Sequence, residues 1–116
     1  MPSIYVFAKV AVEGFHRWPK AVGEEYLRHR HRHKFEIFIR LSVEKSDRDV
    51  EFISLGRYIR KDILVAGFGD PCEFGDLSCE KIAEMIYMRL RLKYGDDRTY
   101  EITVSEDGEN GATYAA

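Results

Sequence analysis

The chain has 116 residues, of which 45% are hydrophobic and 33% charged, with a formal net charge of −2 at pH 7. This balance is typical of one globular domain, expected over residues 1–116, and the charge argues against general attraction to nucleic acid or an anionic membrane. The sequence has no run of about 18 apolar residues and no signal-peptide pattern. We therefore expect a cytoplasmic protein without a membrane segment, in which Cys72 and Cys79 are reduced thiols.

The first elements are predicted from the spacing of apolar residues. β-Branched and aromatic residues over 3–12 predict a first strand that Gly14 ends. After a second strand, apolar residues recur at helical spacing over 51–62 and again over 78–95, where Ser and Gly are the expected caps. The Gly- and Pro-containing segment 67–75 between these two helices is predicted to be a loop.

Two short strands are predicted to close the chain. Apolar and polar residues alternate over 100–105, and residues 112–116 follow a turn at Asp107–Gly111. The predicted order is therefore ββααββ. This order predicts the α+β class, as a four-stranded antiparallel sheet with two helices packed on one face.

The second strand opens with the most informative stretch of the sequence. His29, His31 and His33 alternate with basic residues, and the alternation continues through hydrophobic residues to Val43. A period of two over this length predicts a strand whose buried face carries the histidines as well as core residues. Residues two apart on a strand have Cα atoms roughly 6.6–7 Å apart, so these imidazoles can converge on one metal ion. The alternative is that 28–34 is a solvated basic segment that binds phosphate or nothing.

These features resemble a known family, that of 6-pyruvoyl-tetrahydropterin synthase and 6-carboxytetrahydropterin synthase. The resemblance lies in the order of elements, in a histidine after the first strand and in the His-x-His-x-aromatic motif at 31–35. It implies the T-fold and a zinc ion held by His16, His31 and His33. It also places Glu106 at the position of the glutamate that holds the pterin ring. Three neutral imidazoles leave a fourth zinc position open, as in catalytic sites.

The resemblance further implies a lyase that acts on 7,8-dihydroneopterin triphosphate or a related pterin. It implies a homo-oligomer with ligand sites between subunits. Acidic residues elsewhere balance the arginines of 28–32, so no nucleic-acid partner is expected. The chain departs from the family at two places, because Leu27 stands where a catalytic cysteine is usual and 63–73 contains no histidine for an Asp-His pair. The alternative is therefore a non-catalytic T-fold protein that binds a pterin, purine or nucleotide.

Four side chains are candidates for further roles. Cys79 is either a nucleophile whose pKa a helix dipole lowers or a small buried hydrophobe. His29 is either a general base or an exposed strand-end residue. Glu106 either accepts two N–H donors from an aminopyrimidinone edge or simply ends a strand, and Glu80 is either a second substrate contact or a favourable acid at a helix N-terminus. Trp18 is expected to pack around its loop rather than to stack on a ring.

Overall fold

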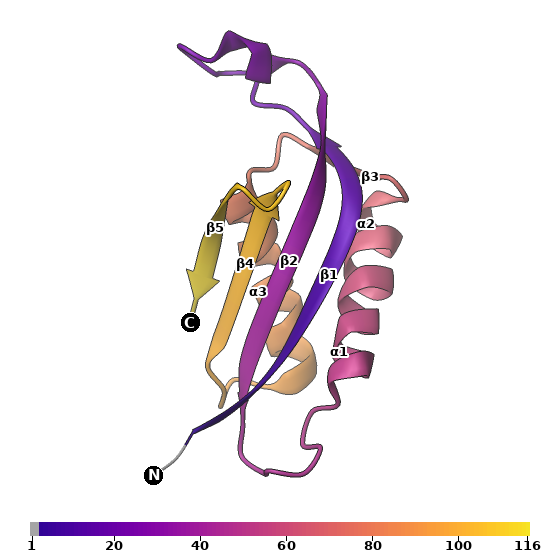
Figure 1. Ribbon diagram of the computed structural model, residues 1–116, viewed down its shortest axis with the longest axis vertical. Helices are drawn as coiled ribbons and strands as arrows, with labels where there is room; N and C mark the ends of the chain where they lie inside the picture. Colours follow the sequence, from indigo (N-terminus) through magenta and orange to yellow (C-terminus); the bar gives the residue numbers. More distant parts are fainter. Residues whose placement is uncertain (1–2) are drawn as a thin grey trace.

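A five-stranded sheet with helices on one face forms the molecule in a computed structural model that describes residues 3–116 (Figure 1). The strands are β1 (Ile4–His16), β2 (His31–Val43), β3 (Cys72–Gly75), β4 (Tyr100–Glu106) and β5 (Asn110–Ala115). Their order across the sheet is β3-β1-β2-β4-β5, and every neighbouring pair is antiparallel except β1 with β3. The predicted α+β class is confirmed.

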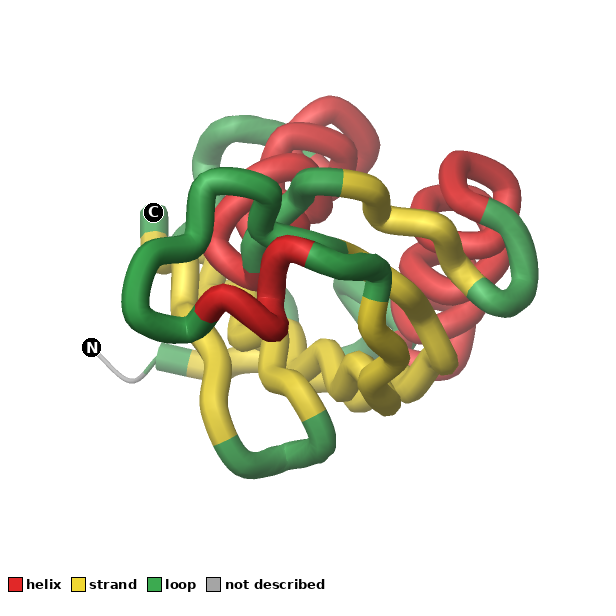
Figure 2. Tube along the Cα trace, turned by 90° about the horizontal axis from the view of Figure 1, so that it is seen from above, coloured by secondary structure: helices red, strands yellow, loops and turns green. Residues whose placement is uncertain are grey.

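Two helical segments lie on the same face of this sheet, as Figure 2 shows from above. The first runs without a break through α1 (Phe52–Arg57), the π-helical η2 (Tyr58–Val65) and α2 (Ala66–Phe68), and the second is α3 (Cys79–Tyr94). A short 3₁₀ turn, η1 (Glu25–Arg28), lies between β1 and β2. Within residues 3–116, no helix is both long enough and apolar enough to cross a membrane.

The inward face of each long strand supplies the core. The residues of this face and of the helices that are entirely buried include Phe35, Ile37, Ile39 and Leu41 of β2, Ile102 and Val104 of β4, and Ile82, Ile86 and Leu90 of α3. Because side chains alternate between the faces of a strand, a shift of one residue would expose the whole row. Burial of this row therefore fixes the register of β2 against its neighbours.

The caps of α3 agree with those predicted from the sequence. The Oγ atom of Ser78 accepts a hydrogen bond from the N–H of Lys81, and Gly95 ends the helix with a φ of 103°. A positive φ costs glycine little because it has no Cβ. The start of α3 is thus fixed beside the end of β1, where it contributes to the site described below.

The sheet differs from the predicted one, because it has a fifth strand and is mixed rather than antiparallel. The segment 67–75 was predicted to be a loop but contains β3, which pairs parallel with Gly14–His16 of β1. The strand has only four residues and follows Gly69 and Pro71. Its alternating pattern is therefore too short to identify a strand from the sequence. The strand forms because its partner, distant in the sequence, offers a free edge.

The first strand also continues beyond Gly14, where the sequence predicted its end. Gly14 pairs with His33 on one side and with Cys72 on the other. A Cβ atom at Gly14 would lie 2.6 Å from Cε2 of Phe74, so the absence of a side chain leaves room for that ring. Glycine is therefore used here for close packing within the sheet, and β1 extends as far as His16.

We expect Gly14→Ala to lower the free energy of unfolding by about 1–3 kcal/mol, because the added methyl must displace the rings of Phe74 and Phe35. Urea unfolding followed by circular dichroism measures this. The matched control is Gly56→Ala in α1, where the added Cβ would meet its nearest neighbour, Cβ of Ala8, at an ordinary 3.8 Å. This change should raise stability by about 0.5–1 kcal/mol. Equal effects of the two substitutions would contradict the packing role of Gly14.

Candidate metal centre

Strand register brings three histidines and a glutamate to one end of the sheet. His16 and His31 are direct partners across β1 and β2, and His33 follows two residues along β2 on the same face. Glu106 is the partner of Phe35 across β2 and β4, so it is the next inward-facing position beside His33. The four side chains therefore meet because each lies on the face of the sheet that the helices cover.

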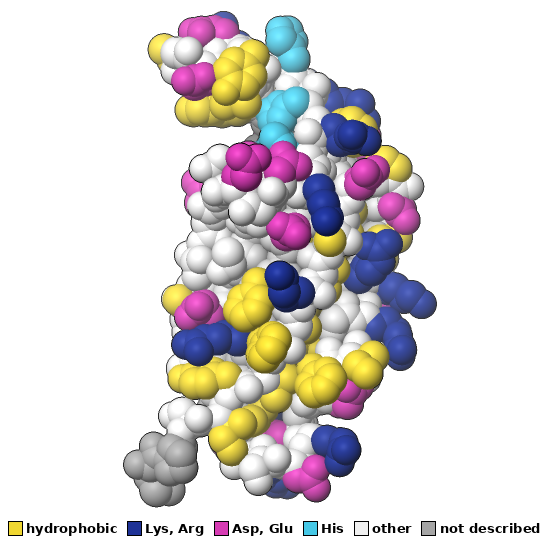
Figure 3. Space-filling model, viewed as in Figure 1, with side chains coloured by type: hydrophobic (Ala, Val, Ile, Leu, Met, Phe, Trp, Pro, Cys, Tyr) yellow, Lys and Arg dark blue, Asp and Glu magenta, His cyan; other side chains and the backbone are white. Residues whose placement is uncertain are grey.

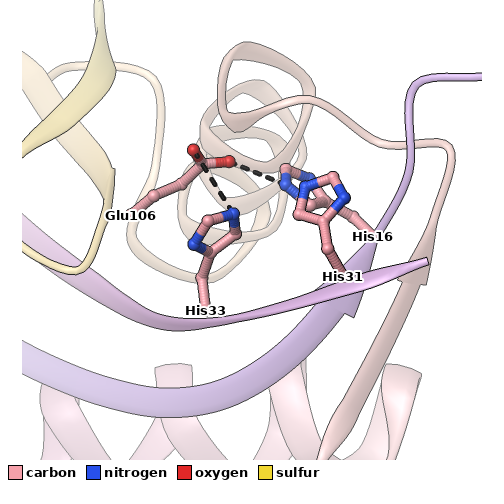
Figure 4. Close-up of side chains that lie close together, drawn as sticks. All are labelled: His16, His31, His33 and Glu106. Atoms are coloured by element: carbon pink, nitrogen blue, oxygen red, sulfur yellow. Dashed lines mark ion pairs between the residues drawn. The ribbon is translucent and has the colours of Figure 1, made fainter. Parts of the chain in front are cut away.

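The four side chains point toward one another (Figure 4). One nitrogen from each of His16, His31 and His33 and one oxygen from Glu106 all lie within 4.8 Å of one another. The ring centroids are 4.6 Å apart for His16 and His31 and 4.9 Å apart for His31 and His33, with the rings nearly edge to face. His16 is buried and the other three are partly buried. This group could hold a metal ion.

Each imidazole is oriented by a hydrogen bond from its Nδ1 atom. The three acceptors are the carbonyl of Leu77 for His16 at 2.9 Å, the carbonyl of His29 for His31 at 2.9 Å, and Oδ2 of Asp107 for His33 at 2.7 Å. Carbonyl and carboxylate oxygens can only accept, so the proton lies on Nδ1 and the lone pair of each neutral ring on Nε2. Metal-binding histidines commonly have this second hydrogen bond, which fixes both tautomer and ring orientation.

The Nε2 atoms are the ones that lack hydrogen-bond partners. Those of His16 and His33 are buried without any hydrogen bond, although Glu106 approaches them at 2.7 and 3.7 Å respectively. A lone pair and a carboxylate turned toward one another repel, and either a proton or a metal cation between them removes the repulsion. A divalent ion with nitrogen ligands at about 2.0–2.1 Å would satisfy all of these atoms, so the residues present fit a metal ion.

Asp107 supports the site from behind His33. Besides His33, its carboxylate accepts a hydrogen bond from the backbone N–H of Lys34 at 2.9 Å. The hydrogen bond from Lys34, followed by that from His33, lowers the pKa of Asp107. The sequence analysis missed this role, since an acidic residue in a turn is common, and the one signal was its place directly after Glu106.

A cavity of about 490 Å³ opens beside the four side chains. This volume lies within the range of small-molecule sites. Its wall is formed by His16, His31 and Glu106, by Trp18 and Leu27 from the segment between β1 and β2, and by residues 76–80 at the start of α3. Figure 3 shows histidine side chains at this end of the molecule, beside the hollow beneath the projecting segment.

Cys79 and Glu80 both line this cavity, at the first turn of α3. Cys79 is only 7% exposed, and its burial, with smaller effects of Glu106 and Glu80, raises the pKa of the thiol to about 12. Burial therefore opposes the lowering of the pKa that a helix dipole would give, because desolvation disfavours the thiolate. A role of Cys79 as nucleophile stays a prediction. The proposed role of Glu80 as a substrate contact stays a prediction.

His29 does not lie on the histidine strand, contrary to the prediction. The turn η1 ends at Arg28 and β2 begins at His31, so His29 lies in an exposed connection. The alternation of histidines in the sequence begins at His29, two residues before the strand does, so it did not indicate where the strand starts. The backbone carbonyl of His29 orients His31, while a role of its side chain as general base stays a prediction.

No protein-family model and no curated protein matches this sequence. Its function is therefore inferred from the residues of the site.

We expect Asp107→Asn to weaken zinc binding by about 10–100-fold, the usual cost of losing such an outer hydrogen bond. Competition with a chromophoric chelator measures this affinity. Asp47→Asn is the matched control, because Asp47 lies between β2 and α1 with its side chain 86% exposed, and within residues 3–116 its one side-chain hydrogen bond or ion pair is with Arg48. Unchanged zinc affinity in Asp107→Asn would contradict the orienting role.

Proposed function

We propose that this chain is a zinc-binding protein of the 6-pyruvoyl-/6-carboxytetrahydropterin synthase type, which binds 7,8-dihydroneopterin triphosphate or a related pterin and acts on it as a lyase. The observation that carries the proposal is the convergence of three imidazole Nε2 atoms and Glu106 beside a cavity. The sequence resemblance relates these same residues to the zinc ligands and the ring-binding glutamate of that family.

Zinc is the metal that this donor set favours. Imidazole nitrogens suit zinc, and three of them leave a fourth position for water or substrate. Zinc bound here would supply a Lewis acid that polarises oxygen atoms of the substrate side chain. The chain itself would contribute three rings already held in the ligating tautomer by His29, Leu77 and Asp107.

Glu106 is assigned to the pterin ring. An ionised carboxylate accepts two parallel N–H bonds from an aminopyrimidinone edge, and such charge-assisted pairs are strong and directional. Glu106 belongs to the metal group and also lines the cavity, so its carboxylate would lie next to the edge of a ring bound beside the metal. Glu80, which also lines the cavity, is a second candidate contact.

A second candidate function is binding of a pterin, purine or nucleotide without turnover. It is favoured because the two candidate catalytic groups, Cys79 and His29, are poorly suited to proton transfer or nucleophilic attack. A thiol with a pKa of about 12 is almost entirely protonated near neutral pH, so Cys79 is a poor nucleophile as it stands. The side chain of His29 lies in an exposed connection and does not line the cavity. The lyase therefore needs a proton-transfer group that the binding protein does not.

Self-association is part of the proposal. The sheet face opposite the helices exposes apolar side chains, among them Phe7 at 61% exposure, which stacks on Phe38. The outer edge of β5 has no partner strand among residues 3–116, and bare edges favour pairing with another chain. We infer a homo-oligomer in which ligand sites lie between subunits.

Metal content and turnover test the function. We expect the purified protein to retain zinc and to convert 7,8-dihydroneopterin triphosphate, with product resolved by chromatography. His31→Ala should abolish both zinc retention and turnover. His29→Ala is the matched control, because alanine keeps the backbone carbonyl that orients His31, and it should retain zinc.

The possible results separate the candidates. Pterin binding to the zinc form without turnover would replace the lyase by the binding protein. Loss of turnover in His29→Ala with zinc retained would identify His29 as the base. Absence of zinc affinity in the wild-type protein would overturn the metal centre and the zinc-dependent lyase.

Glu106→Gln distinguishes a ring-binding glutamate from a fourth metal ligand. We expect the variant to keep zinc but to bind neopterin roughly 10–100-fold more weakly, because a charged hydrogen-bond acceptor is lost. Calorimetry with neopterin and chelator competition for zinc measure the two affinities separately. Loss of zinc from this variant would instead make Glu106 a metal ligand.

A further inference from the structure

The segment 17–30, here called the flap, connects two residues of the metal group. It begins after His16 and ends before His31, which are partners across β1 and β2. Figure 1 shows it projecting beyond the end of the sheet. The base of the flap is tied to the region after β3, because the N–H of Arg17 donates to the carbonyl of Gly75 at 2.9 Å and its Nε donates to Asp76 at 2.8 Å.

The flap has a folded structure of its own. The N–H of Trp18 donates to the carbonyl of Leu27 at 2.7 Å, and the carbonyl of Trp18 accepts from the N–H of Ala21 at 3.1 Å. Arg28 Nε donates to the carbonyl of Ala21 at 2.7 Å, and Ala21 is entirely buried. Hydrogen bonds on both sides of Trp18 therefore hold its backbone in place above the site.

The indole of Trp18 lies on the cavity wall with much of its surface uncovered. It is 52% exposed, and none of the aromatic ring pairs within residues 3–116 includes it. Phe15, by contrast, is covered by Arg30, whose Cζ lies 3.5 Å from its ring centroid. Packing of Trp18 around its own loop, as predicted from the sequence, therefore does not account for the exposed half of its surface. Tyr26, also on the flap, is 70% exposed but does not line the cavity.

We propose that Trp18 is a ligand-binding residue, whose indole packs against the planar ring of a ligand held between the flap and the start of α3. This inference rests on the proposed function, which supplies the ring. An aromatic plane gains most from an offset or edge-to-face arrangement with a second flat ring. Glu106 and Glu80 line the same cavity, so they supply polar groups for the edge of a ring whose face packs against Trp18.

Calorimetry with neopterin and the zinc-loaded protein tests this assignment. We expect Trp18→Ala to weaken neopterin binding on the order of tenfold, and Trp18→Phe, which keeps an aromatic face, to stay within about threefold of wild type. Tyr26→Ala is the matched control on the same flap and should leave the affinity unchanged. Zinc affinity should be the same in all four proteins, which separates ring packing from disruption of the centre.

A second measurement needs no variant. Trp18 is the one tryptophan of the chain, so acrylamide quenching, normalised to the fluorescence lifetime, reports its accessibility alone. We expect accessibility to fall when neopterin saturates the protein. Unchanged accessibility, or equal neopterin affinity in Trp18→Ala, would overturn the role of Trp18 while leaving the proposed function intact. Failure of the wild-type zinc form to bind neopterin would overturn this inference together with the pterin ligand, whereas the metal centre would still be tested by zinc retention.

Discussion

The pairing of β1 with β2 is the constraint on which the site depends. Their register runs without interruption from Ile4 opposite Val43 to His16 opposite His31. Along this ladder Ile37, Ile39 and Leu41 of β2 are aliphatic and entirely buried, and at the His16–His31 end the inward positions are imidazoles. A slip of one residue would expose the aliphatic row, so the hydrophobic effect fixes the register and thereby also fixes the histidines. The position of the four candidate ligands is thus determined by core residues that lie outside the group.

A second constraint is the set of acceptors that hold the three rings. They come from different parts of the chain: the segment between β3 and α3, the connection before β2, and the turn after β4. Each acceptor binds the Nδ1 atom of one imidazole and leaves the Nε2 atom available for a metal ion. The free energy needed to orient the rings is therefore supplied when the chain folds and not when a metal binds. This is what preorganisation means for a metal centre.

The sequence predicts those features that local patterns express. Alternation along β2 correctly gives the shared face of His31 and His33, and the same parity in β4 places Glu106 on a buried face. His16 carries no local signal and was found through the resemblance alone. Burial of Cys79 agrees with the helical spacing of the buried residues of α3, because Cys79 lies three and four residues before Ile82 and Ala83 on the same face.

Other features could not be read from residue types at all. The acceptors for His16 and His31 are backbone carbonyls, which every residue possesses, so neither Leu77 nor His29 is marked by its side chain. The strand β3 has four residues and exists because Gly14 lets Phe74 approach β1. Such features depend on contacts between distant segments, and a single sequence does not record which segments meet.

The position of the cavity bears on whether a metal in this site would exchange ligands. Structural zinc sites are closed by four protein ligands, whereas catalytic sites keep one position for water or substrate. Here the cavity lies directly against His16, His31 and Glu106, and His31 is only partly buried. A centre built only to stabilise the fold gains nothing from a hollow of about 490 Å³ beside it, because burying apolar surface there would stabilise the protein more. The open side of the group therefore favours a centre that meets a ligand, and Glu106, which faces both the imidazoles and the hollow, is the residue through which metal and ligand would compete or cooperate.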